Sequence, residues 1–328
     1  MDDSNPARHN VSTLVAMEQF ERYYAIVSEW SQISETKLLS FPQIEHAWAL
    51  FKPHFYTQPS DFTSAAIVLS VFVPVFFVYR SLTKAFGLRL GKLFGLKLKD
   101  AAKFSESLLF FVTYTSFFII SATTAIHDGY MFNPVEVYTD NTNISFWAYF
   151  VMYAELSHYI TSLILMFSDV RNKHKDIPIM LTHHIITLSL MTMAFVGKGQ
   201  YKLFLQTIAF HDFTDIFLEG SKLVHYMVGD PLSGIPFVMF AASFAYTRIY
   251  MLPKHIFLPI TQYGNALNDG DMFLHKAFVG FFWGLYTLHL AWMWMIIRMC
   301  WGIVKGTVRG DIRSDGEGER VKGKKVQA

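Results

Sequence analysis

The apolar residues of the chain fall into seven long blocks that are separated by polar stretches. The blocks cover residues 62–79, 105–126, 146–167, 178–196, 203–218, 235–252 and 277–303. A helix needs about 20 residues to cross the hydrocarbon core of a bilayer, and irregular backbone is not tolerated against lipid. The pattern therefore predicts an all-α integral membrane protein with about seven transmembrane helices.

The lysine and arginine residues between the blocks indicate how the chain is oriented. Three stretches are rich in these residues, namely 80–103, 171–175 and 305–325. The connection 127–145 contains none. Because basic connections stay on the cytosolic side, we expect a lumenal or interfacial N-terminal segment and a cytosolic tail. Sequons at Asn10 and Asn143 fall on the predicted lumenal side, and the charged, Gly-rich tail is predicted to be disordered.

Composition changes this picture in two respects. Charged residues make up 16% of the 328 residues, against about 25% in soluble proteins. The single cysteine, Cys300, excludes an internal disulfide and a zinc site with several cysteine ligands.

Several ionisable residues lie within the predicted helices. The fourth block contains the pair His183 and His184. The fifth block and the residues just after it contain a second set, which is His211, Asp212, Asp215, Glu219 and Lys222. The last four are spaced three, four and three residues apart, so they lie on one helical face. Ionisable groups inside a membrane are costly and usually line a cavity or a pathway, so these residues predict a functional site.

The short connection between the fourth and fifth helices makes them antiparallel neighbours. The acidic face should then approach the histidine pair, with Asp215 and Glu219 nearest to it in depth. A carboxylate beside a histidine fixes its tautomer and stabilises its charged form, as in a general base or an activated nucleophile. Two other interpretations stay open: the residues are buried packing groups, or they bind a metal. The chain contains no His-x-x-His-His cluster of the kind found in membrane di-iron enzymes.

Two further groups of basic residues are candidates for binding. Arg248 lies inside the sixth block and should reach a carboxylate, a cavity or a phosphate, unless it extends to the membrane surface. The residues Arg171, Lys173 and Lys175, here called the basic loop, are a topological signal. At the mouth of a cavity they could also hold the phosphates of a coenzyme.

The order and spacing of these residues are similar to those of a known family. They resemble the Lag motif of the ceramide synthases, which is the core of the TRAM–LAG–CLN8 (TLC) fold. The segments that carry the resemblance are 103–107, 153–157, 175–176, 183–187 and 211–222, with Thr247 and Arg248. The resemblance covers residues 103–303. His174 and Thr214 depart from the pattern, which has a basic residue and a serine at these positions.

The resemblance implies N-acylation of a sphingoid long-chain base by a fatty acyl-CoA at the endoplasmic reticulum membrane. The implied fold is one outer helix plus a six-helix bundle around a central cavity. The chain would divide into an N-terminal segment, a first helix with a basic connection, a TLC domain and a tail, at residues 1–61, 62–102, 103–304 and 305–328. The predicted catalytic residues are His183, His184, Asp212 and Asp215. The predicted substrate-binding residues are His211, Glu219, Lys222, Arg248, Arg171, Lys173, Lys175 and Tyr153.

No metal and no cofactor is implied beyond acyl-CoA as co-substrate. The other implied partners are membrane lipid and further subunits of a homo- or hetero-oligomer, with no nucleic acid. Two alternatives remain: a TLC protein that senses, carries or chaperones lipid without catalysis, and a transporter that uses the buried acids as a proton relay. The histidine pair also allows two routes. Either His183 takes the acyl group with His184 as base, or one histidine is a general base for direct attack by the amine.

Overall fold

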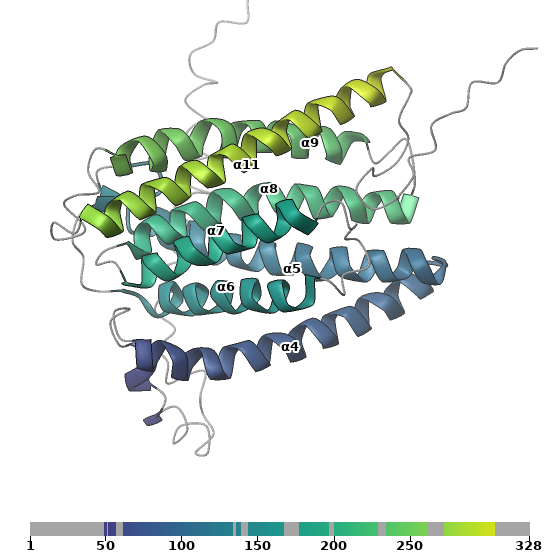
Figure 1. Cartoon of the computed structure of the whole chain (residues 1–328). Helices are drawn as coiled ribbons and strands as arrows, with labels where there is room; N and C mark the ends of the chain where they lie inside the picture. Colours follow the sequence, from purple (N-terminus) through teal and green to yellow (C-terminus); the bar gives the residue numbers. More distant parts are fainter. Residues whose placement is uncertain are drawn as a thin grey trace, which may run out of the picture.

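The computed structural model of the chain describes residues 49–50, 52–56, 62–133, 136–138, 144–166, 177–196, 200–228, 234–261 and 272–305. Within these residues the fold consists of long helices that run side by side as a bundle (Figure 1). The helices are α4 (Phe62–Leu93), α5 (Leu98–His127), α6 (Phe146–Leu165), α7 (Ile177–Val196), α8 (Tyr201–Val228), α9 (Gly234–Phe244) and α11 (Met272–Val304). Most of the predicted N-terminal segment, the basic loop and the tail after Lys305 lie outside the described residues.

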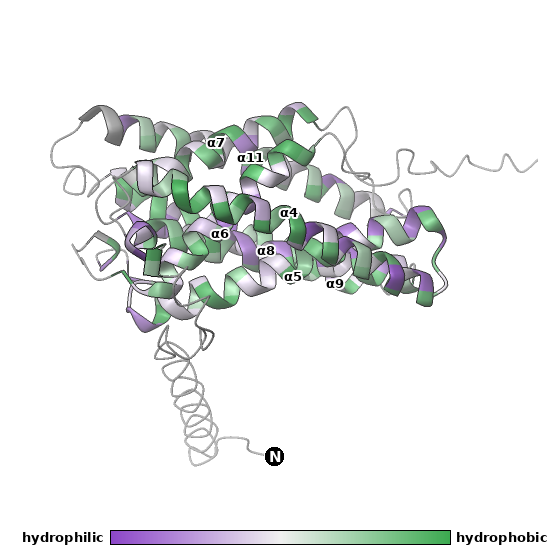
Figure 2. Cartoon of the chain, turned by 90° about the horizontal axis from the view of Figure 1, so that it is seen from below, coloured by the Kyte–Doolittle hydropathy of each residue, from purple (hydrophilic) through white to green (hydrophobic). Residues whose placement is uncertain are grey.

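Five of the described helices are long and apolar enough to cross a membrane. They are α4, α5, α7, α11 and the continuous helix Gly234–Thr261 that begins with α9. Figure 2 shows their long apolar stretches, which are interrupted by hydrophilic positions. The prediction of an all-α membrane protein is confirmed. Helices α6 and α8, which are not among the five, carry buried polar residues of the bundle interior, and α8 packs against α5, α6, α7 and α9.

Helix α4 lies at the edge of the bundle and packs against α5 and α6 (Figure 1). It continues to Leu93, well beyond the end of the predicted block at residue 79. The extension is held against α5 by a close approach, since a Cβ atom on Gly87 would lie 2.9 Å from the Cα atom of Ser105. An ion pair between Lys84 and Glu106 joins the same two helices. Hydropathy falls from Arg80 onwards because the following residues include lysine and arginine. These residues are good helix formers, so the helix continues.

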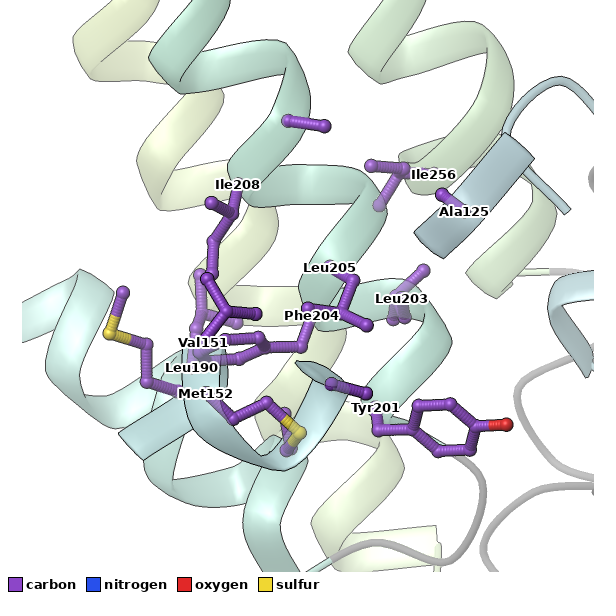
Figure 3. Packing of buried hydrophobic residues seen from close by; sticks show 14 of the residues in the cluster. Ala125, Val151, Met152, Leu190, Tyr201, Leu203, Phe204, Leu205, Ile208 and Ile256 are labelled. Atoms are coloured by element: carbon purple, nitrogen blue, oxygen red, sulfur yellow. The ribbon is translucent and has the colours of Figure 1, made fainter. Parts of the chain in front are cut away.

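The apolar core lies between α5, α6, α7, α8, α11 and the later part of the helix Gly234–Thr261. Figure 3 shows one part of it, where Val151 and Met152 of α6 meet Leu190 of α7 and Phe204 of α8. Phe55 belongs to the predicted N-terminal segment, yet its ring is buried in this core. At least this part of the segment therefore packs on the bundle.

A group of polar contacts closes one end of the bundle. Lys202, at the start of α8, is only 1% exposed and donates from Nζ to the carbonyl oxygen of Glu136 at 3.1 Å. One turn later, Gln206 Nε2 donates to the carbonyl oxygen of Met131 at 2.9 Å. These bonds satisfy main-chain acceptors of the connection between α5 and α6, which would be costly to bury alone.

The helix that begins with α9 changes to π-helical geometry at η3 (Ala245–Met251) and η4 (Pro253–Phe257). Pro253 has no N–H to donate, which interrupts regular α-helical bonding there. Such π segments often occur at functional sites. Here η3 carries Arg248 into the bundle.

Candidate active site

A cavity of about 200 Å³ lies among the helices of the bundle, and we call it the polar cavity. Its walls include His183 and His184 from α7, together with Asp215, Glu219 and Lys222 from α8. Helix α7 packs against both α8 and α11, which brings these residues to one place. The sequence predicted that Asp215 and Glu219 lie at the depth of the histidine pair, and the shared cavity agrees with this prediction.

The two histidines differ in their surroundings. His184 donates its Nδ1–H to the carbonyl oxygen of Met180 at 2.8 Å, because that oxygen can only accept. In the neutral ring the lone pair is therefore on Nε2. His183 Nδ1 lies 3.4 Å from the hydroxyl oxygen of Thr187, a longer contact, and its ring meets Trp292 edge-on at 5.1 Å. The two imidazole rings are inclined at 84°, so they present their nitrogen atoms in different directions.

The charged residues near the pair bond to one another. Arg248 Nη2 lies 2.7 Å from Asp215 Oδ1 and also donates to the carbonyl oxygen of His211 at 3.1 Å. Lys222 Nζ lies 2.9 Å from Glu219 Oε1. Arg248 thus reaches a carboxylate, as its position in the sequence suggested. The hydrogen bonds that orient the histidine pair come from Met180 and Thr187, so the predicted support by Asp212 and Asp215 would act through charge rather than through direct bonds.

A second, smaller cavity of about 40 Å³ extends further into the bundle, and we call it the apolar cavity. Most of its wall is apolar, and its polar residues are Glu155, Tyr159, Thr187, Thr207, His211 and Asp212. Tyr159 lines both cavities, and its ring lies 5.7 Å from that of His184. The reaction centre that the sequence predicts would therefore lie where the two cavities meet.

The buried polar residues of this region that were not predicted to belong to the site include Glu155, His158 and His289. Glu155 of α6 is hydrogen-bonded to Asp212. His158 of α6 lines the polar cavity. His289 of α11 lies with its Nε2 atom 3.1 Å from Nε2 of His211. Each is an ionisable residue inside a predicted membrane helix, and this was the signal that could have identified them.

The contacts of His211 fix the same tautomer as in His184. Its Nδ1–H donates to the carbonyl oxygen of Thr207 at 2.8 Å, so its Nε2 accepts from Nε2–H of His289. Both rings are buried. His211 is thereby fixed in orientation by three elements, since Arg248 of η3 binds its carbonyl oxygen.

Two predicted binding groups are not placed in the cavities. Tyr153 is buried in the core and packs its ring against Phe55, Phe72 and Phe195, and it lines neither cavity among the described residues. These are packing contacts with α4, with the chain before it and with α7, and the role of Tyr153 in substrate binding stays a prediction. The basic loop lies outside the described residues.

Comparison with known proteins identifies the relatives of the chain. The model of the TLC domain family matches residues 103–298. Human ceramide synthase 4 is 31% identical over 221 residues, which are 66% of this chain and 54% of that protein. Human ceramide synthase 5 is 30% identical over 170 residues (52% and 42%), and sphingosine N-acyltransferase lag1 of Schizosaccharomyces pombe is 23% identical over 235 residues (67% and 59%). The chain spans about half the length of the curated relatives it matches. It belongs to the TLC domain family.

Proposed function

We propose that this chain transfers a fatty acyl group from acyl-CoA to the amino group of a sphingoid long-chain base, giving a ceramide or dihydroceramide. The observation that carries the proposal is the fixed tautomer of His184, which leaves an Nε2 lone pair on a residue that lines the polar cavity. The names of the relatives, ceramide synthase and sphingosine N-acyltransferase, support the same reaction.

The two histidines have separate roles in the proposed reaction. His183 attacks the carbonyl carbon of the thioester, so that a C–N bond forms and the C–S bond breaks with release of the CoA thiolate. The amine of the base then attacks the acyl-imidazole, which forms the amide bond and frees His183. His184 accepts at Nε2 the proton that the amine nitrogen loses in this step. The nucleophile and the base must be different nitrogen atoms. The two rings are inclined to each other, so His183 and His184 can present one nitrogen atom each to different parts of the substrate.

The ion pairs of the site supply fixed charge around the reacting groups. Asp215 and Arg248 are already bonded to one another, so their charges need not rearrange when charge develops on the thioester oxygen. Lys222 and Arg248 are two of the cations that line the polar cavity. We assign them, with His211 and Glu219, to substrate binding.

The remaining assignments concern the membrane. The basic loop would hold the phosphates of CoA at the cytosolic surface, since CoA is too polar to enter the bilayer. The protein would reside in the endoplasmic reticulum membrane with a lumenal N-terminus and a cytosolic C-terminus. It would work there as part of a homo- or hetero-oligomer.

The test is expression of the chain in cells that lack ceramide synthase, followed by ceramide profiling of lipid extracts. We expect the wild-type chain to restore ceramide. His183→Ala and His184→Ala should restore none at equal protein abundance. Restored viability without new ceramide would instead favour a TLC protein that carries or senses lipid.

The covalent step has its own measurement. Purified enzyme incubated with acyl-CoA alone should gain the mass of one acyl chain, and His183→Ala should not. Absence of the adduct in an active enzyme under single-turnover conditions would favour direct attack by the amine, with a histidine as general base.

A further inference from the structure

Two acidic side chains, Glu155 of α6 and Asp212 of α8, are buried against one another at the polar end of the apolar cavity. They are 1% and 4% exposed. Their carboxyl groups are hydrogen-bonded to each other. Ionised carboxylates can only accept, so this bond requires that one of the two groups carries a proton. Two buried carboxyl groups that bond to each other do not both ionise, and the pair therefore holds at most one negative charge.

Donors from other residues do not reach two oxygen atoms of the pair. Across the described part of the chain, no N–H or hydroxyl group of another residue donates to Glu155 Oε1 or Asp212 Oδ2. A buried acceptor without a donor is unfavourable. A ligand that brings several N–H donors and one positive charge would satisfy both oxygen atoms and the charge of the pair. A primary ammonium group is such a ligand, since it carries three donors.

The rest of the apolar cavity suits what an amine lipid carries behind its head group. Beyond the acid pair its wall is formed by apolar side chains, among them Leu190, Met191, Phe204, Phe278 and Phe282. A cavity of about 40 Å³ with acidic and apolar walls suits the head group and the first methylene groups of a long-chain amine. A fatty acyl thioester has no cation for the acid pair to bind.

The acid pair is also close to the reaction centre. Tyr159 lines both cavities, and its ring contacts those of His183 and His184. Thr187, which bonds to His183, lines the apolar cavity as well. An amine held by the acid pair would thus share two neighbours, Tyr159 and Thr187, with the histidine pair.

We propose that Glu155 and Asp212 together bind the protonated amine of the long-chain base, whose tail begins in the apolar cavity. This inference rests on the proposed function. Alkylamines are protonated at neutral pH, as the lysine side chain is, and an ammonium group is not a nucleophile. It passes one proton to the ionised member of the pair, which becomes neutral, and the free amine then attacks the acyl group. The pair returns this proton to solvent after the product leaves.

The test is steady-state kinetics of the purified full-length chain with sphinganine and acyl-CoA. The variants are Glu155→Gln, Asp212→Asn and the double variant, and each single variant keeps one carboxylate. We expect the KM for sphinganine to rise about threefold in each single variant and at least 30-fold in the double variant, which is more than the product of the single effects. The KM for acyl-CoA should change less than twofold throughout.

The chain offers a matched control for the loss of a buried acid. Glu106 is 2% exposed, bonds to Lys84 and lines neither cavity described above. Glu106→Gln should leave both KM values within twofold of wild type. A rise in the KM for acyl-CoA in the double variant, or equal effects on both substrates, would overturn the assignment of the amine to this pair.

A binding measurement on the wild-type protein avoids dependence on folding of the variants and on turnover. Sphinganine is compared with an analogue in which a hydroxyl group replaces the amine, in the absence of acyl-CoA. The proposal requires that sphinganine binds at least 30-fold more tightly, and equal affinities would refute it. Tight, amine-selective binding without ceramide formation would instead contradict the proposed function and leave the amine site standing.

Discussion

Replacement of Arg248 by methionine is expected to destabilise the protein, because this cation holds η3 against α8. Its Nη2 atom lies 2.7 Å from Asp215 Oδ1 and 3.1 Å from the carbonyl oxygen of His211. Its side chain is 6% exposed. Methionine keeps much of the apolar length of arginine, so the substitution mainly removes the charge and the donors.

The size of the effect follows from the exposure of the partner that remains. Removal of one member of a buried ion pair costs about 3–5 kcal/mol. The side chain of Asp215 is 19% exposed, so water can reach the carboxylate that is left, and we expect a loss of about 3 kcal/mol. Asp215→Asn should cost about 2 kcal/mol, because Arg248 keeps the carbonyl oxygen of His211. The double variant should lose only about 2 kcal/mol, about 3 kcal/mol less than the sum of the single losses.

Thermal unfolding of the four proteins in one detergent measures this coupling. At about 2–4 °C per kcal/mol, Arg248→Met should lower the midpoint by about 6 °C or more, and the added Asp215→Asn should raise it again by about 2–4 °C. Lys254→Met removes an exposed cation from η4 and is the control, with an expected change below about 0.5 kcal/mol. Losses that simply add, with the double variant less stable than either single one, would refute the pairing.

Three further outcomes are expected. Gly87→Ala should lower stability by about 1–3 kcal/mol, since its Cβ atom would lie 2.9 Å from the Ser105 backbone. Gly280→Ala is the control, because a Cβ atom there would have no atom within 4 Å. Equal thermal unfolding midpoints for the two variants would contradict the close approach of α4 and α5. Neutralising the basic loop should raise the KM for acyl-CoA more than that for the base, with a difference that shrinks at high salt; parallel changes would argue against phosphate binding. In sealed microsomes, protease should remove a C-terminal tag and spare an N-terminal one, and the reverse pattern would contradict the orientation.

The parts of the fold that depend on one helix alone were predictable from the sequence. Block length and hydropathy identified the helices, and the spacing of Asp212, Asp215 and Glu219 predicted a polar face on α8. Depth followed from the rise per residue, so the meeting of Asp215 with the level of the histidine pair was also predictable.

Contacts between helices were not predictable in the same way. The bonds from Glu155 to Asp212 and from His289 to His211 depend on how α6 and α11 are rotated about their axes, which a helical period does not fix. The same rotation places Tyr153 in the core instead of the cavity wall. The extent of α4 was underestimated because its last turns are charged and are held by packing against α5, not by lipid.

Amide formation by the purified, reconstituted chain is the measurement on which the proposed function depends most directly. Proteoliposomes that contain the wild-type protein receive isotope-labelled acyl-CoA and sphinganine, and the lipid product is identified by mass. We expect labelled dihydroceramide from the wild-type protein and none above background from His183→Ala or His184→Ala, with unchanged elution and unfolding midpoints. Wild-type rates in both alanine variants, or a folded wild-type protein that forms no amide, would contradict the proposal.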